Sequence, residues 1–275
     1  ALPEKYRSEG VSLYSLFSTI PNLLGPLIAV GIWHVENMSI FAIVMIFIAV
    51  TTTLFGYRTT FANTQKEVSP KDEVLPFNAM TVYVQFFKNK ALFCSGMIMI
   101  LSSIVFGAMS TFIPLYTVRE GFANAGIFLT IQAITVVIAR FYLRKYVPSD
   151  GLWHHRFMMI VLTLLMVASV IVAFGPHIVS IFVYISAIFI GITQALVYPT
   201  LTTYLSFVLP KIGRNMLLGL FIACADLGIS LGGVLMGPIS DTVGFKWMYI
   251  LCALLVTIAM TLSKIRQRQS VSKAS

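Results

Sequence analysis

Asp226 has the clearest potential for chemistry in this sequence, because it is an acid inside an apolar run. The run extends from about residue 215 to 238, and Asp226 lies about eleven residues from its start. That position is near the middle of a helix long enough to cross a membrane, where an aspartate costs roughly 2.5–3.5 kcal/mol. Such a residue usually faces a cavity or a partner. Two interpretations follow: Asp226 carries protons or contacts a substrate, or it bonds to a neighbouring helix and locks two parts of the protein together.

Polar side chains in two further apolar runs are candidates for a binding cavity. Arg140 comes eight residues after Gln132, the one amide in its run, and could bind a carboxylate or extend to the membrane surface. Gln194, Tyr198 and Thr202 recur every four residues and share one helix face. That face could form a polar wall for a substrate, or it could hydrogen-bond to a neighbouring helix.

The composition identifies a membrane protein and excludes several other classes. Of the 275 residues, 58% are hydrophobic and only 11% are charged, whereas a soluble domain carries about 25% charged residues. The net charge of +9 lies in short loops and forms no basic stripe with interleaved aromatics, so no nucleic-acid partner is predicted.

Catalytic and metal-binding motifs are missing from the sequence. The cysteines Cys94, Cys224 and Cys252 lie in apolar runs without metal-ligand spacing, which predicts neither a disulfide nor a metal site. Motifs of membrane proteases, ATP-driven pumps and serine hydrolases are absent as well. We therefore expect no enzyme activity, no metal and no cofactor.

Eight apolar runs are long enough to be membrane-spanning helices. Their approximate bounds are 10–33, 39–56, 91–118, 125–143, 157–174, 178–208, 215–238 and 245–265. The longest polar stretch, 57–90, separates the first two runs from the other six, and a polar tail covers 266–275. Of the 19 basic residues, 17 fall on the side that both ends of the chain share, which the positive-inside rule assigns to the cytoplasm. The sequence thus predicts a multi-pass protein of the cytoplasmic membrane with both ends inside.

The chain contains two copies of a Leu-Pro-x-x-x-Arg motif, one at Pro3 and Arg7 and one at Pro210 and Arg214. At a constant offset of 207 residues, six positions are identical between the copies and the runs that follow them. They pair Leu2, Pro3, Arg7, Leu13, Leu24 and Gly25 with Leu209, Pro210, Arg214, Leu220, Leu231 and Gly232. An internal repeat of apolar spans is typical of transporters built from two related halves.

Small residues mark the runs that follow both motifs. They are Gly25 and Pro26 in the first run and Gly228, Gly232, Gly233 and Gly237 in the seventh. Such residues let helix backbones approach closely and let helices bend. We expect close packing at these positions and a hinge that seals one side of a transporter.

These motifs, together with the long central loop, resemble the major facilitator superfamily, in particular its twelve-span drug:proton antiporter branch. The resemblance implies an all-α fold of two six-helix bundles. Residues 1–56 would be the last two helices of the N-terminal bundle, 57–90 the cytoplasmic central loop, 91–265 the C-terminal bundle and 266–275 a cytoplasmic tail. The chain starts at Ala1 without a methionine, so it looks like a fragment that lacks the first four helices. The antiporter motif Gly-x-x-x-Gly-Pro-x-x-Gly-Gly keeps only Gly25-Pro26, since Pro21 and Ala29-Val30 replace its other glycines.

Longer strings are similar to members of this family that export a nicotianamine-like metal chelator. The strings are ALPEKYRSEGVSLYSLFSTIPNL, FANAGIFLTIQAI and VLPKIGRNMLLGLFIACADLGISLGG. This resemblance implies a small polar metallophore as substrate, which carries several carboxylates, amines and an imidazole. The resemblance also implies that the transporter's partners are protons and the lipid bilayer, and that its mechanism is proton-coupled alternating access.

Two alternatives remain open at this point. A multidrug:proton antiporter of the same fold would have an apolar, aromatic cavity and would not depend on a cationic group. A membrane protein that serves interaction or assembly without transport would tolerate Asp226→Asn and Arg140→Gln, but not a large residue at Gly232.

Overall fold

The structure is a computed structural model that describes residues 38–58, 84, 86–210 and 213–271. Within these ranges every regular element is helical. The long helices are α2 (Met38–Arg58), α4 (Lys90–Glu120), α5 (Ala125–Leu143), α6 (His155–Ala173), α7 (Ser180–Val208), α8 (Arg214–Val243) and α9 (Phe245–Val271). Two short 3-10 helices, η2 (Arg144–Tyr146) and η3 (Gly175–His177), follow α5 and α6.

Six of these helices, α4 to α9, are long and apolar enough to cross a membrane, and α2 contains a shorter apolar stretch, Ala42–Gly56. Seven of the eight predicted runs therefore correspond to helices, and the run 10–33 lies outside the described residues. The chain is all-α and polytopic, as the sequence predicted.

Two helices continue past the ends that the sequence suggested. The run 215–238 was expected to stop at Pro238, but α8 continues through this proline to Val243. The hydroxyl of Thr242 donates to the Pro238 carbonyl at 2.8 Å, which is one way to satisfy backbone groups beside a proline in a membrane helix. Likewise α9 extends to Val271, so most of the predicted tail is helical.

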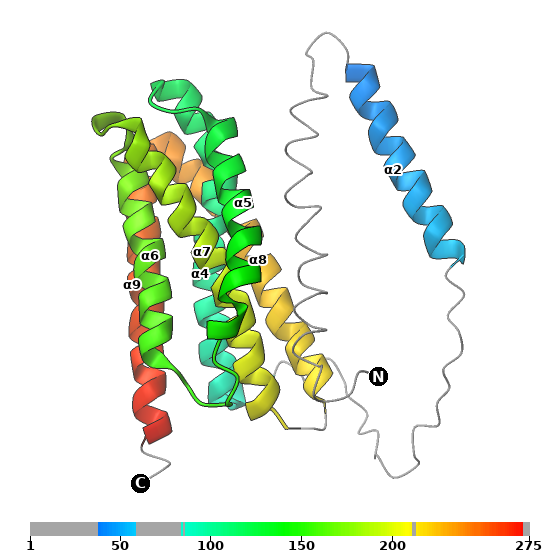
Figure 1. Ribbon diagram of the computed structural model, residues 1–275, viewed down its shortest axis with the longest axis vertical. Coiled ribbons are helices and arrows are strands. Elements are labelled where there is room, and N and C mark those ends of the chain that lie inside the picture. Colours follow the sequence, from blue (N-terminus) through cyan, green and yellow to red (C-terminus); the bar gives the residue numbers. More distant parts are fainter. Residues whose placement is uncertain (1–37, 59–83, 85, 211–212, 272–275) are drawn as a thin grey trace.

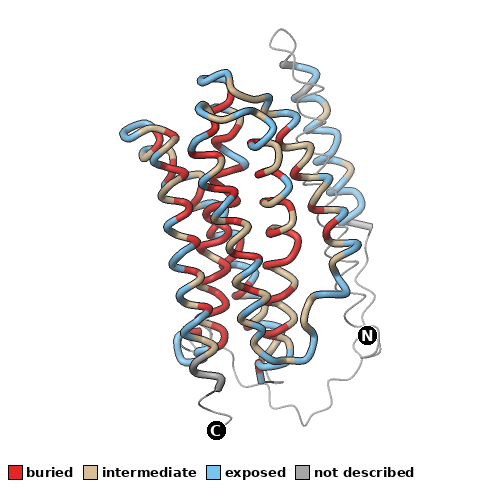
Figure 2. Tube along the Cα trace, turned by 60° about the vertical axis from the view of Figure 1, so that its left-hand side comes forward, coloured by how far each residue is buried: buried red, intermediate tan, exposed pale blue. Residues whose placement is uncertain are grey.

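Helices α4 to α9 form one bundle, with α4 as its most buried member (Figures 1 and 2). The most extensive packing joins the helices in pairs: α4 with α8, α6 with α9, and α5 with α7. In Figure 1, α6 and α9 lie at one side of the bundle, and α8 crosses it diagonally from the other side towards the start of α9. The side chains of α2 are mostly exposed.

Asparagine and glycine residues set the ends of the helices that carry the candidate site. Asn89 caps α4 by accepting from the amides of Ala91 and Leu92, at 3.0 and 3.3 Å. Asn124 caps α5 in the same way, accepting from the Ile127 amide at 3.1 Å. Between them, Gly121 ends α4 in the left-handed conformation (φ +66°), which glycine adopts without strain.

Glycines allow the closest helix approach in the bundle, between α4 and α8. A Cβ atom at Gly232 would clash with the backbone carbonyl of Ile104, and one at Gly228 would lie 2.5 Å from Cβ of Ser103. From the α4 side, a Cβ at Gly107 would clash with the Ile229 carbonyl. By contrast, Gly237 has ordinary space, with its nearest neighbour 3.7 Å away, and so does Gly233, at 3.8 Å. The glycines that the sequence grouped together therefore differ in how tightly they are packed.

This difference gives a matched pair of substitutions. We expect Gly232→Ala to destabilise the folded protein by roughly 1–3 kcal/mol, because the Ile104 carbonyl belongs to a helix backbone and cannot rotate away. Gly237→Ala should be neutral or stabilising, since it gains the same helix propensity without a clash. Thermal unfolding of the detergent-solubilised full-length protein tests this, and equal melting temperatures for the two variants would refute it.

Candidate functional site

The candidate site begins with a pair of glutamine side chains between α5 and α7. Nε2 of Gln132 donates to Oε1 of Gln194 at 3.1 Å, and Gln132 is buried. Gly191 brings the two helices together, because a Cβ there would lie 2.7 Å from the Gln132 carbonyl oxygen. Nothing in the sequence singled out Gly191. The sequence predicted an interhelical hydrogen bond as one role for the polar face that contains Gln194, and Gln194 makes such a bond. The bond holds two polar groups inside the bundle.

Arg140 and Tyr198 follow this pair along α5 and α7, towards the end of the bundle where α5 meets η2. Arg140 is eight residues after Gln132, or about 12 Å along the axis of α5. Its side chain is half-buried and its Nε atom is fully buried. Tyr198 lies close enough to interact electrostatically with Arg140. The α5–α7 interface therefore carries a cation about two helical turns, and a tyrosine about one helical turn, along from the two amides.

Tyr198 also connects this group to α8. Its ring packs against Phe221, with centroids 6.0 Å apart and an interplanar angle of 31°. Thr202, the third residue of the predicted face, turns its hydroxyl to its own helix and donates to the Tyr198 carbonyl at 2.7 Å. We name Gln132, Arg140, Gln194 and Tyr198 the polar cluster, and we leave Thr202 out of it because its hydroxyl bonds to its own helix.

Asp226 does not join the polar cluster. It is exposed, and within the described part of the chain it makes no hydrogen bond or ion pair. At about 100° per residue, it lies roughly 160° around α8 from Gly228, on the side away from α4. Counted from the end of α7 at Val208 and the start of α8 at Arg214, Asp226 is 12 residues along α8 and Gln194 is 14 residues along α7, so they lie at similar heights in the bundle.

In the second Leu-Pro-x-x-x-Arg motif, between α7 and α8, the last residue hydrogen-bonds back to the first. Nε and Nη2 of Arg214 both donate to the carbonyl of Leu209, the residue before Pro210, at 3.3 and 3.0 Å. Gly213 precedes α8 with a positive φ of 74°. This arginine therefore serves the backbone of the turn. The first copy, with Pro3 and Arg7, lies outside the described residues, as do Gly25 and Pro26.

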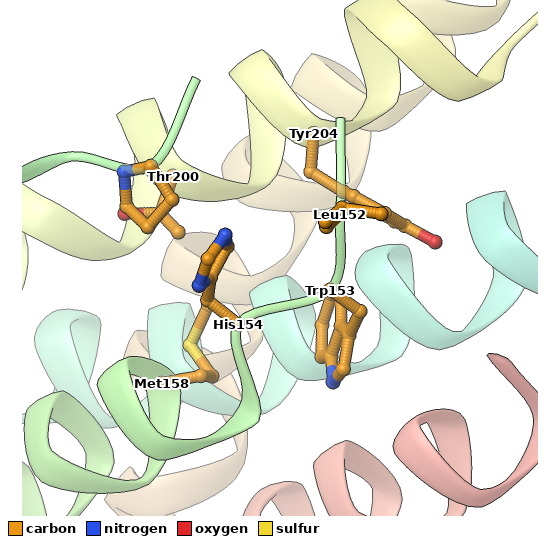
Figure 3. Close-up of a pocket in the computed structure, with 7 residues that line it drawn as sticks. Leu152, Trp153, His154, Met158, Thr200 and Tyr204 are labelled. Carbon is orange, nitrogen blue, oxygen red and sulfur yellow. The ribbon is translucent and has the colours of Figure 1, made fainter. Parts of the chain in front are cut away.

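A small pocket lies between α7 and the loop that joins α5 to α6 (Figure 3). It is lined by Pro148, Leu152, Trp153, His154, Met158, Thr200 and Tyr204. Its empty volume of about 250 Å³ includes open solvent, and it falls below the roughly 300 Å³ typical of small ligand sites. Trp153 closes it by donating to the Ser263 carbonyl at 3.1 Å and stacking edge-on against Tyr204. We interpret this pocket as a packing feature of the loop between α5 and α6.

The described residues contain no group of three His, Cys, Asp or Glu side chains that could hold a metal ion. Cys94, Cys224 and Cys252 are buried free thiols. The polar cluster offers two amides, a guanidinium and a phenol, which suit a polar anionic ligand better than a metal ion.

Comparison with known proteins identifies the family. A sequence profile described as Major Facilitator Superfamily matches residues 1–233 and 125–275. The staphylopine export protein of Staphylococcus aureus (strain Mu50 / ATCC 700699) is 71% identical over 267 residues, which cover 97% of this chain and 67% of that protein. MFS-type transporters without an assigned function, from Burkholderia mallei (strain SAVP1) and Burkholderia pseudomallei (strain 668), are each 23% identical over 64% of this chain and 42% of their own length. The chain belongs to the Major Facilitator Superfamily, and it is a polytopic, all-α membrane transporter and not an enzyme.

Proposed function

We propose that this chain exports a small polar metallophore of the staphylopine class across the cytoplasmic membrane. The observation that carries the proposal is the 71% identity to the staphylopine export protein over 97% of the chain. The other relatives are too distant to suggest a substrate, at 23% identity. Because the chain spans 67% of the export protein's length, the proposal concerns the full-length transporter.

The polar cluster fits the chemistry of such a substrate. A metallophore of this class carries carboxylates, amines and an imidazole, so it needs both a cation and neutral hydrogen-bonding groups. Arg140 supplies the cation, with donors whose planar geometry matches a carboxylate. Gln132 supplies an amide about two helical turns away on α5, and Gln194 and Tyr198 supply an amide and a hydroxyl from α7. The Gln132–Gln194 hydrogen bond would have to open for either amide to contact the substrate fully.

Asp226 is our proposed proton carrier. An aspartate exposed to lipid at mid-membrane would be costly, so its exposed position on α8 favours a surface that faces a cavity or the other half of the transporter. Within the described bundle this carboxylate makes no hydrogen bond or ion pair, so a role in transport would not compete with a structural contact. Alternating access would expose it in turn to the outside, where it binds a proton, and to the cytoplasm, where it releases one. The proposed orientation places both ends of the chain in the cytoplasm, from the distribution of 17 of the 19 basic residues.

Export of the metallophore from cells expressing the full-length transporter tests this function. We expect the exported amount to fall to background when a protonophore collapses the proton gradient. If these cells instead export unrelated cationic dyes and no metallophore, the multidrug alternative replaces our proposal. If they export neither while the protein reaches the membrane, the interaction or assembly alternative gains support.

A further inference from the structure

The side-chain oxygen of Gln132 is a buried acceptor without a donor. Gln132 is only 7% exposed, and its Nε2 atom is engaged in the bond to Gln194. Its Oε1 atom is fully buried, yet no donor in the described part of the chain reaches it. An amide oxygen can accept two hydrogen bonds, and a buried acceptor without a partner is destabilising. This position therefore suits a ligand that brings its own hydrogen-bond donor.

The backbone around this acceptor is held by close helix packing. A Cβ atom at Gly191 would lie 2.7 Å from the backbone oxygen of Gln132, so α7 already touches α5 at this level. The hydroxyl of Thr193, the neighbour of Gln194, donates to the Val161 carbonyl of α6 at 3.2 Å. Helices α5, α6 and α7 are thus tied together at the height of the glutamine pair. The side chains of the pair can turn towards a ligand, whereas the backbones cannot move apart without losing these contacts.

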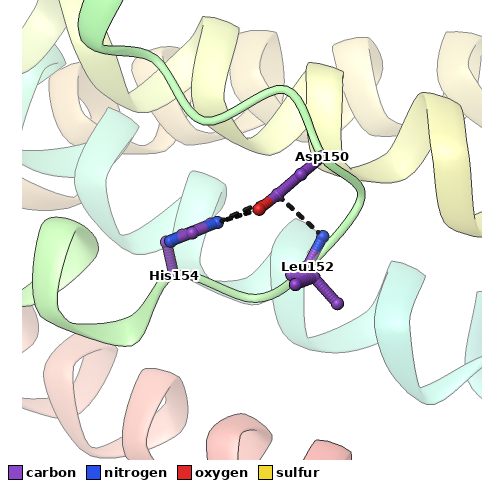
Figure 4. Close-up of polar contacts among 3 residues, drawn as sticks. All are labelled: Asp150, Leu152 and His154. Carbon is purple, nitrogen blue, oxygen red and sulfur yellow. Dashed lines mark hydrogen bonds and ion pairs between the residues drawn. The ribbon is translucent and has the colours of Figure 1, made fainter.

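A carboxylate would be the strongest partner for a positively charged ligand group, but no acid of the described ranges belongs to the polar cluster. Asp150, the first acid after Arg140 in the chain, accepts from the Leu152 amide at 3.0 Å and contacts Nε2 of His154 at 2.7 and 2.9 Å (Figure 4). These contacts keep it within the loop between α5 and α6. The remaining acids of these ranges lie near the ends of α4 and α8 or on the exposed side of α8, namely Glu120, Asp241 and Asp226. A cationic group of a ligand in the cluster therefore meets neutral oxygen atoms.

The spacing of the polar cluster sets a second condition on the ligand. Arg140 is the cation of the cluster, and it lies about 12 Å along α5 from Gln132. On α7, Gln194 and Tyr198 are one helical turn apart and share a face within this interval. A ligand whose carboxylate and amine are several bonds apart matches this spacing better than an α-amino acid, in which one carbon joins both groups.

We propose that Oε1 of Gln132 accepts a hydrogen bond from a protonated amine of the substrate while Arg140 binds a carboxylate of the same molecule. Because Oε1 is buried, the Gln132 side chain turns away from Gln194 when the substrate binds. A neutral amide–amide bond is then replaced by a bond to a charged donor, which is the stronger of the two. This role rests on the export function proposed above, and it makes Gln132 the residue that selects an amino carboxylate over a carboxylate without a basic nitrogen.

The test compares uptake of the metallophore and of its N-acetylated derivative by inverted membrane vesicles that contain the full-length transporter. Acetylation removes the positive charge of the amines and leaves the carboxylates unchanged. The wild-type transporter should reach half-saturation at a roughly tenfold lower concentration of the unmodified metallophore than of the derivative. Gln132→Met should lose most of this preference, because methionine has a similar length but lacks the amide oxygen.

Gln194→Met is the matched control for this substitution. It breaks the same interhelical hydrogen bond but leaves the acceptor of Gln132 in place, so it should keep the preference for the unmodified metallophore. If the glutamine pair only held α5 and α7 together, both variants would behave alike. Gln132→Asn, which keeps an amide but draws it back by one methylene, should lower the preference in part, and it replaces Gln132→Met if that variant does not reach the membrane.

Three results would overturn this role of Gln132 while leaving the export function intact. One is equal uptake of the metallophore and its acetylated derivative by the wild-type transporter. Another is an equal loss of preference in Gln132→Met and Gln194→Met, which would mean that the pair is structural. The third is a Gln132→Met variant that still prefers the free amine but no longer distinguishes a carboxylate from its methyl ester, which would mean that the amide of Gln132 donates to a carboxylate. Vesicles that take up neither compound would instead overturn the export function, and the role of Gln132 with it.

Discussion

Replacing Asp226 with asparagine is expected to reduce metallophore export by the full-length transporter to the level measured with a protonophore. Asparagine keeps the size of the side chain but cannot gain or lose a proton, so a carrier coupled through this residue would lose its driving force. Because Asp226 makes no hydrogen bond or ion pair within the described residues, the substitution should not lower the amount of folded protein in the membrane. Export normalised to membrane protein is the measurement.

Asp241 provides the matched control. It is an exposed aspartate on the same helix, near the outer end of α8 instead of its middle. Asp241→Asn removes the same carboxylate at a depth where ionisation costs little, so we expect nearly normal export. Asp226→Glu keeps a titratable group and should retain part of the activity. Normal export by Asp226→Asn would show that this acid is not the coupling group, and coupling would then have to be sought elsewhere in the transporter.

The membrane spans could be predicted from the sequence because each carries its own signal. Asn124 and the run that follows it are enough to predict a helix starting at 125, and the structure begins α5 at Ala125. The repeated Leu-Pro-x-x-x-Arg motif and the glycines likewise identify the family without a structure. Where a helix ends was harder to predict at Pro238, since a proline inside a membrane helix is tolerated when nearby groups satisfy the backbone.

The pairing of the helices could not be predicted in the same way. All six long helices are apolar on most of their surface, so periodicity does not indicate which helix packs against which. Gly107 and Gly191 acquire their importance only from the backbone carbonyls across the interface, which belong to Ile229 and Gln132. For the same reason, the sequence left open whether Arg140 extends to the surface or binds a carboxylate, and only the structure shows that its Nε atom is buried. A long cationic side chain can extend to the surface or stay buried, and the neighbouring residues on α7 decide which conformation it takes.

This burial makes Arg140 the second residue whose loss should have a large effect. Arg140→Gln removes the charge while keeping a polar side chain, and we expect the apparent affinity for the metallophore to fall by roughly 30-fold or more. That factor corresponds to about 2 kcal/mol, the lower limit for truncating one partner of a buried, hydrogen-bonded charge pair. Arg140→Lys should recover part of the affinity, because it restores the charge without the planar donors. The control is Arg156→Gln, at an exposed position on α6, which should export normally.

The substrate itself can separate a binding role for Arg140 from a structural one. If Arg140 binds a carboxylate, then esterifying that carboxylate should weaken export by the wild-type transporter but have little further effect in Arg140→Gln, because the two changes remove the same contact. If Arg140 only supports the bundle, both proteins should lose the same factor on esterification. A transporter that exports the acid and its ester equally well before any substitution would show that no cation recognises the carboxylate. The polar cluster would then hold helices α5 and α7 together and would not bind the substrate.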